Sequence, residues 1–339
     1  MLSLTCYFTK KETENNSIIE DVRALCDSMN VILVEISIDG DPDLEKKFAG
    51  RSPVLQAGPY TLNFPFSLKD VEVVIRSAQQ RFDRMSENSD SDEAKRLLRG
   101  QEMTRGDRFG LWFARNYVKV VLAILIIFTG LPFLAPVLEK TGNDGLAKVI
   151  YTIYKPLCHQ LTYRSYFLFG EQTVYPRELA NVAGDLTYEQ ITGLNAFDLT
   201  AARNFIGNEV VGYKVAFCER DVAMYGSMIL FGLLFQLTGR KLKQLPWYLW
   251  VILAVLPIAV DGLTQLPSLM VNPLAWLPYR ESTPFLRALT GGLFGFFSGW
   301  FIFPLMEESV AVTRVALSRK MAVISKIEES TKHQGHIAE

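Results

Sequence analysis

A short stretch of the chain carries several side chains able to do chemistry: Cys158, His159, Gln160 and Arg164. His159 is the only histidine outside the C-terminal tail, and Cys158 is one of two cysteines after residue 119. Thiolate and imidazole groups bind zinc and iron, and a pair of cysteines can also form a disulfide. The residue types therefore predict metal binding or thiol chemistry at this stretch.

Three other segments end their apolar stretches with ionisable or polar residues that we expect on the same side of a membrane. Ionisable groups at the edge of the hydrocarbon usually face a polar interior, because exposing them to lipid is costly. The four segments therefore predict one site. Its candidate catalytic residues are Cys158, His159, Cys218, Asp221 and Asp261, and its candidate substrate-binding residues are Gln160, Arg164, Arg220, Gln265, Arg280 and Glu281.

Three interpretations of this site stay open. In the first, Cys158, His159 and Cys218 bind zinc or iron together with Asp221 or Asp261. In the second, the two cysteines form a disulfide on an oxidising outer face. In the third, both are buried thiols and the charged residues form salt bridges, or a pocket for an anionic headgroup.

Apolar residues are unevenly distributed along the 339-residue chain, in which they make up 49%. Each of four uncharged runs has about the length of a bilayer-spanning helix: 120–137, 222–239, 244–260 and 288–306. They predict an all-α polytopic membrane domain at 117–306, whose partner is the lipid bilayer. The net charge of −1 gives no indication of nucleic-acid binding. The run 262–279 is also uncharged, but its three prolines favour an outer loop or re-entrant segment.

Basic residues gather before the first span, between spans two and three, and after span four. The positive-inside rule then predicts a multi-pass protein of the inner (plasma) membrane with both termini in the cytoplasm, including a tail at 307–339. The segment 149–169 lies outside and is interrupted by Lys155, Pro156 and Arg164, which predicts a broken helix dipping into the outer leaflet. The insertion 171–217 is expected to form a small cap, with helical patterns at 186–197 and 201–210.

Residues 1–82 show the order strand, helix, strand, helix, two strands and helix, and a charged linker at 83–116 follows. This order resembles the thioredoxin/glutaredoxin fold, with Ser52-Pro53 where that family carries its cis-proline. Residues 10–16, where the family carries its redox cysteines, contain none, and Cys6 and Cys26 are expected to be buried. We therefore expect a redox-inactive module whose role is to dock a cytosolic partner, to regulate the protein or to stabilise it.

The motifs of the membrane domain resemble a bacterial and archaeal membrane family known as domain of unknown function number two thousand and eighty-five. The resemblance covers about 150–305 and rests on Cys158-His159-Gln160 with Arg164-Ser165, Cys218-Glu219-Arg220-Asp221, Asp261 to Gln265, and Arg280-Glu281-Ser282 with Arg287. It departs from that family in the insertion after Gly170 and in the added N-terminal domain. The family implies no established activity.

From the residues themselves we expect a metal- or thiol-dependent membrane enzyme acting on a lipid or quinone-like substrate. The alternatives are a transporter or binding protein for a small anion or lipid headgroup, and a non-catalytic scaffold. The glycines at 291, 292, 295 and 299 are expected to allow close packing of the last span.

Overall fold

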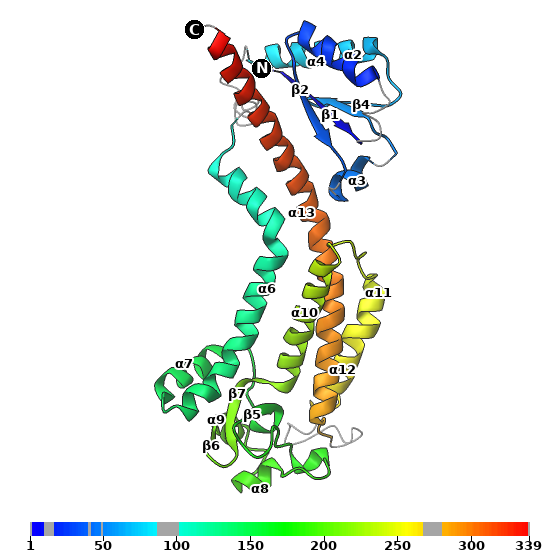
Figure 1. Ribbon diagram of the computed structural model, residues 1–339. Coiled ribbons are helices and arrows are strands. Elements are labelled where there is room, and N and C mark those ends of the chain that lie inside the picture. The colour runs from blue at the N-terminus through cyan, green and yellow to red at the C-terminus, as the bar shows by residue number, and fades with distance from the viewer. Residues whose placement is uncertain are drawn as a thin grey trace. The chain divides into compact units, whose positions relative to one another are not determined.

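The computed structural model describes residues 2–9, 17–39, 42–48, 50–86, 102–266 and 280–337. The chain divides into two compact units, one of residues 1–116 with 308–339 and one of residues 117–307. Two elements continue from one unit into the other, the helices α6 (Arg105–Lys140) and α13 (Pro284–Ile337) (Figure 1).

The first unit contains a four-stranded sheet in the order β2-β1-β3-β4. β1 (Ser3–Phe8) pairs in parallel with β2 (Ile32–Ser37) and antiparallel with β3 (Val54–Ala57), which forms a hairpin with β4 (Tyr60–Asn63). The helices of this unit are α2 (Ser17–Ser28), α3 (Pro42–Phe48) and α4 (Leu68–Ser86), together with the unit's parts of α6 and α13. The expected order of strands and helices is confirmed, and the Ser52–Pro53 peptide is cis.

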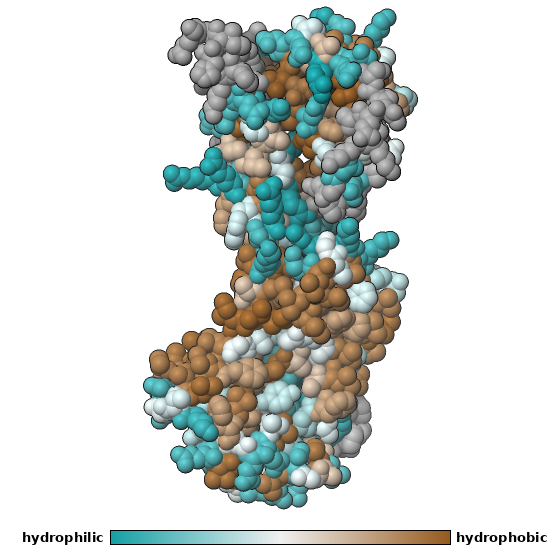
Figure 2. Space-filling model, in the orientation of Figure 1, coloured by the Kyte–Doolittle hydropathy of each residue, from teal (hydrophilic) through white to brown (hydrophobic). Residues whose placement is uncertain are grey.

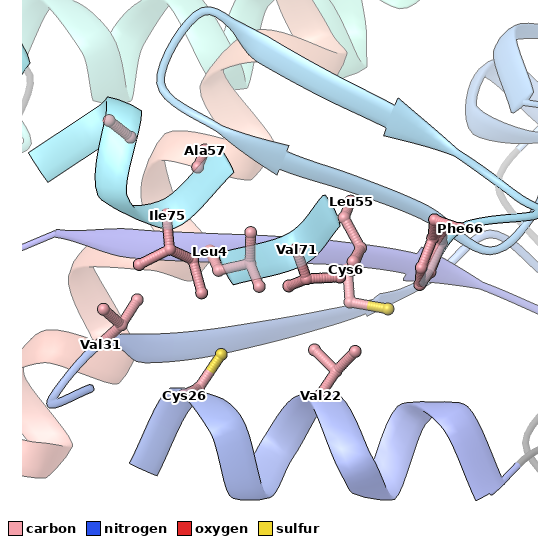
Figure 3. Close-up of a cluster of buried hydrophobic side chains, with 11 residues drawn as sticks. Leu4, Cys6, Val22, Cys26, Val31, Leu55, Ala57, Phe66, Val71 and Ile75 are labelled. Carbon is pink, nitrogen blue, oxygen red and sulfur yellow. The ribbon is translucent and has the colours of Figure 1, made fainter. Parts of the chain in front are cut away.

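The core of this sheet contains both N-terminal cysteines (Figure 3). Cys6 and Cys26 pack among Leu4, Val22 and Leu55, and each sulphur-bearing side chain is at most 1% exposed. Burial raises the pKa of the Cys26 thiol to about 11, so it stays protonated at neutral pH. The prediction that these two cysteines are buried is confirmed, whereas the expected position of the redox motif, 10–16, lies outside the described residues.

The second unit combines long helices with short elements that gather at one end of α10 and α13 (Figure 1). Its further helices are α7 (Asp144–Tyr154), α8 (Tyr188–Thr192), α9 (Leu199–Asn204), α10 (Glu219–Leu237), α11 (Trp247–Trp250), the π-helical η3 (Val251–Val255) and α12 (Leu256–Leu263), with 3-10 turns η1 (Thr162–Arg164) and η2 (Glu178–Ala180). Trp250 donates from its indole N–H to the Ser298 hydroxyl at 3.0 Å, which joins α11 to α13.

A three-stranded antiparallel sheet in this unit overturns the expectation of an all-α domain. The order is β5-β7-β6, formed by β5 (Ser165–Leu168), β6 (Gly207–Asn208) and β7 (Gly212–Cys218). The expected broken helix over 161–169 is therefore wrong, since η1 and β5 occupy it. Residues of β5 alternate between buried and half-buried, which is the period of a strand. In the cap, 186–197 and 201–210 contain only the short α8 and the end of α9 as helix.

Within the described part of the chain, two helices are long and apolar enough to cross a bilayer, Arg105–Lys140 and Pro284–Glu329. Only 28% and 39% of their most apolar windows are buried, so much of their apolar surface faces outward (Figure 2). The second and third predicted spans correspond to α10 and to the shorter apolar run Trp247–Leu263. Of the uncharged run 262–279, residues 267–279 lie outside the described part of the chain.

Glycines set the distance between α10 and α13. A Cβ at Gly295 would lie 1.8 Å from the Met224 carbonyl oxygen, and one at Gly291 would lie 2.4 Å from the Arg220 carbonyl oxygen. A Cβ at Gly299 would lie 3.1 Å from Phe231, while nothing lies within 4 Å of one at Gly292. The predicted role in close packing is confirmed for three of the four glycines and is wrong for Gly292.

Candidate functional site

Two cysteines from distant parts of the chain meet where β7 ends and α10 begins. Cys158 lies just after α7, and its N–H donates to the Tyr154 carbonyl oxygen at 3.0 Å. Cys218 is the last residue of β7, paired with Ser165 of β5. The Cys218 N–H donates to Sγ of Cys158 at 3.3 Å, so the strand pairing brings the two side chains together.

Asp221 completes this group from the first turn of α10. The Cys218 thiol donates to Oδ2 of Asp221 at 3.1 Å, and the two sulphurs and a carboxylate oxygen all lie within 4.8 Å of one another. The contact with Cys158, burial and the Asp221 carboxylate together raise the pKa of Cys218 well above its usual value. We call Cys158, Cys218 and Asp221 the Cys–Cys–Asp cluster; both of its cysteines are free thiols in the structure.

Thiolates with a carboxylate form a donor set that suits zinc or iron. His159, predicted as a third ligand, does not join it: the residue is exposed, and its carbonyl oxygen accepts from Nε of Arg203 at 2.8 Å. Of the ligands expected from the sequence, Cys158, Cys218 and Asp221 therefore lie together, whereas His159 lies apart.

Gln160 holds the loop after Cys158 in place. Its backbone has a φ of 51°, a left-handed conformation uncommon for a residue with a side chain. In this conformation its N–H lies 3.5 Å from Sγ of Cys158, while its side-chain amide donates to the carbonyl oxygens of Tyr151 and Ala216 at 2.9 and 3.1 Å. The structure thus gives this predicted substrate-binding residue a positioning role.

Glu281 is the centre of a buried ion-pair network. It pairs with Arg164 at 2.6 Å, with Arg177 at 3.2 Å, and with Arg287. Arg287 also contacts Glu219 at 3.3 Å, and burial raises the pKa of the Glu219 carboxyl despite this neighbour.

A second network surrounds Asp261, whose side chain is 3% exposed. Arg220 pairs with one of its oxygens and Arg280 with the other, at 2.9 Å, while the Ser282 hydroxyl donates to it at 3.0 Å. Gln265 donates from its side-chain amide to the Asp261 backbone carbonyl oxygen, at 2.5 Å. This bond ties Gln265 to the backbone at the end of α12. It does not involve the Asp261 carboxylate.

The first turn of α10 connects the cluster to both networks. Its consecutive residues Glu219, Arg220 and Asp221 contact Arg287, Asp261 and Cys218 respectively. Together the two networks hold five arginines against three carboxylates. Nε of Arg220 and Nε of Arg287 are buried donors without a hydrogen-bond partner among the described residues. Such an arrangement suits an anionic group.

Arg177, Glu219 and Lys214 were not among the residues predicted for the site. Arg177 lies in the insertion in which no chemistry was expected, Glu219 was part of a motif but not of the predicted site, and Lys214 is fully buried in β7. Lys214 donates to the carbonyl oxygens of Gln160 and Arg203 at 2.9 and 2.8 Å. Burial lowers its pKa to about 7. A lysine in an otherwise apolar strand, Val-Ala-Phe following it, was the available signal.

A family model described as predicted membrane protein (DUF2085) matches residues 198–301. The matched part contains Cys218, Asp221, Asp261, Arg280 and Glu281, and it begins after Cys158, so it is shorter than the resemblance over 150–305 that the motifs predict. The uncharacterized protein MJ1492 of Methanocaldococcus jannaschii is 27% identical over 205 residues, which are 58% of this chain and 96% of that relative. No solved structure matches the chain significantly.

Proposed function

We propose that this protein is a metal-dependent membrane enzyme in which Cys158, Cys218 and Asp221 hold zinc, with iron as the second choice. The observation that carries the proposal is the approach of two sulphurs and a carboxylate oxygen to within 4.8 Å of one another. Structural zinc sites are usually closed by four protein ligands, whereas catalytic sites have three and keep a position open. Three donors therefore favour a catalytic site over a structural one.

Bound there, the metal would act as a Lewis acid on a substrate oxygen or on water. The chain's own contribution is to hold the donors and to provide charge near them. Arg220 follows Cys218 by two residues in the chain, and its guanidinium pairs with Asp261. The excess of arginines over carboxylates supports a substrate with an anionic group, and the surrounding apolar surface supports a lipid or quinone-like one.

The proposal includes a membrane topology. The four apolar runs cross the inner membrane, both termini lie in the cytoplasm, and the site opens to the outside, as the distribution of basic residues supports. The N-terminal unit is a thioredoxin-like module without a redox pair. The parallel pairing of β1 with β2 and the antiparallel pairing of β1 with β3 support this assignment. A cytosolic protein is its proposed partner.

The test is elemental analysis of the full chain purified in detergent without chelator. About one zinc or iron per chain is expected in the wild type, and Cys158→Ser and Cys218→Ser should lose it. Cys26→Ser is the matched control, because it removes a buried thiol from the other unit. Equal metal in all four proteins would reject the cluster as the site.

A thiol count of the denatured, metal-free chain separates the remaining readings. Four free thiols are expected, one for each cysteine. A count of two free thiols would indicate a Cys158–Cys218 disulfide, which would mean a redox or structural bridge in place of the metal centre. Four thiols without any metal would favour the second candidate, a binding protein or transporter for a small anion, for which the arginine excess is the supporting observation.

A further inference from the structure

Gln160, which contacts Cys158 of the Cys–Cys–Asp cluster, also lines a polar pocket. It has a volume of about 220 Å³, and its lining includes the four basic side chains of Lys148, Lys155, Arg203 and Lys214. Among the described residues no acidic side chain lines it. Four basic side chains without a carboxylate in one hollow differ from the paired arginines of the candidate site and favour an anion as occupant.

The walls of this pocket are held by hydrogen bonds. Arg203 is fixed by donation from Nε to the His159 carbonyl oxygen at 2.8 Å. Lys214, which is fully buried, donates to two carbonyl oxygens, and an ammonium group has three donors. One donor of this buried cation is therefore left for a ligand.

The helix that supplies two of these lysines has three different faces. Ala147, Ile150, Tyr151 and Tyr154 are buried against the unit. Lys148, Thr152 and Lys155, three or four residues apart, share a polar face toward the pocket.

The third face of α7 and the turn after it is apolar and exposed. Its residues recur every three or four positions and form what we call the α7 ridge: Leu146 (61% exposed), Val149 (52%), Ile153 (54%) and Leu157 (57%). Figure 2 shows apolar side chains over this part of the molecule, which is labelled α7 in Figure 1. A helix with a basic face beside an exposed apolar face lies in a membrane interface, with its apolar face in the acyl-chain region.

We propose that the pocket binds the phosphate headgroup of an anionic phospholipid, whose acyl chains lie along the α7 ridge. The two features complement the two parts of one lipid molecule. Basic pockets between membrane helices bind anionic headgroups by the same combination of charges. A soluble anion would use the pocket and leave the ridge without a role.

The test measures binding to the full chain in a neutral detergent by native mass spectrometry. The probes are dioctanoyl phosphatidylglycerol, dioctanoyl phosphatidylcholine and inorganic phosphate. Phosphatidylglycerol should bind about tenfold or more tightly than phosphatidylcholine, because only the former carries net negative charge. Lys148→Gln with Lys155→Gln should weaken phosphatidylglycerol binding by about tenfold or more.

The double substitution Lys241→Gln with Lys243→Gln removes the same charge from an exposed loop and should leave binding unchanged. Val149→Ser with Ile153→Ser should weaken binding of phosphatidylglycerol about fivefold or more, but not that of phosphate. Because all four substituted side chains of the pocket and ridge are exposed, folding is preserved. Equal binding of both lipids would overturn the proposal, and so would phosphatidylglycerol binding that is no tighter than phosphate binding and that the ridge substitutions leave unchanged.

Discussion

The backbone N–H of Cys218 donates a hydrogen bond to Sγ of Cys158, 3.3 Å away and sixty residues apart in the chain. This contact places the second thiol at the start of α10, one turn from Asp221. The bond also gives the Cys158 sulphur a fixed position before any metal binds. A preformed pair of sulphurs costs less ordering entropy on metal binding than two flexible side chains would.

Asp221→Asn should reduce metal affinity by more than about 100-fold, since even second-shell partners of a ligand contribute roughly 10–100-fold. Cobalt(II) titration of the metal-free protein, followed by the sulphur-to-cobalt absorption, measures this. His159→Ala is the matched control, because His159 is exposed and lies beside Cys158 in the chain. If His159→Ala lost most of its metal affinity while Asp221→Asn kept the wild-type affinity, His159 and not Asp221 would be the ligand.

Glu281→Gln should destabilise the protein by about 3–5 kcal/mol, because removal of one partner leaves buried charges uncompensated. Three arginines pair with this carboxylate, and its side chain is 0% exposed. Thermal unfolding in detergent measures the change. Glu171→Gln removes an exposed carboxylate from the same unit and should stay within about 0.5 kcal/mol of the wild type. Similar unfolding of both variants would show that the Glu281 network adds little to stability.

Gly295→Ala should destabilise the packing of α13 on α10 by about 1–3 kcal/mol or more, because the added methyl group overlaps the Met224 carbonyl oxygen. Gly292→Ala lies on the same helix three residues earlier and meets nothing within 4 Å. It should be neutral or slightly stabilising, since alanine favours helix over glycine. Thermal unfolding of the two variants compares them directly. Equal effects would mean that the helices separate at little cost.

Much of this site follows from side-chain chemistry at the ends of apolar runs. Asp261 with Arg280, and Glu281 with Arg164, could be expected to meet once four segments were assigned to one side. Charged residues near lipid need partners, and few are available. The strands could not be found in this way. β5 has four residues, and its partner β7 begins at Gly212, so no local pattern shows that they pair.

The same limit explains the misplaced histidine and the missed lysine. The loop that contains His159 is held by bonds from the Gln160 side chain to Tyr151 and Ala216, which are tertiary contacts that no local pattern shows. Lys214 looks like a surface residue of an insertion when read alone. It can be buried because two backbone carbonyl oxygens from other segments accept hydrogen bonds from its ammonium group.

Lys214 should make stability depend on pH between about 7 and 10. Burial lowers its pKa from 10.5 to about 7 in the folded protein, whereas the unfolded chain keeps the ordinary value. Between these values the unfolded state binds more protons, so the free energy of unfolding rises with pH. Below pH 7 both states are protonated, and the cost of the buried charge is present in full.

The measurement is the difference in thermal stability between the wild type and Lys214→Met across this pH range. We expect the wild type to gain stability relative to the variant as the pH rises from 7 to 10. Comparison with Lys241→Gln, an exposed lysine of the same unit, removes effects common to the whole protein. A difference that stays constant with pH would mean that Lys214 keeps its proton throughout. Added phosphatidylglycerol should flatten the wild-type profile, because an anion in the pocket favours the charged lysine.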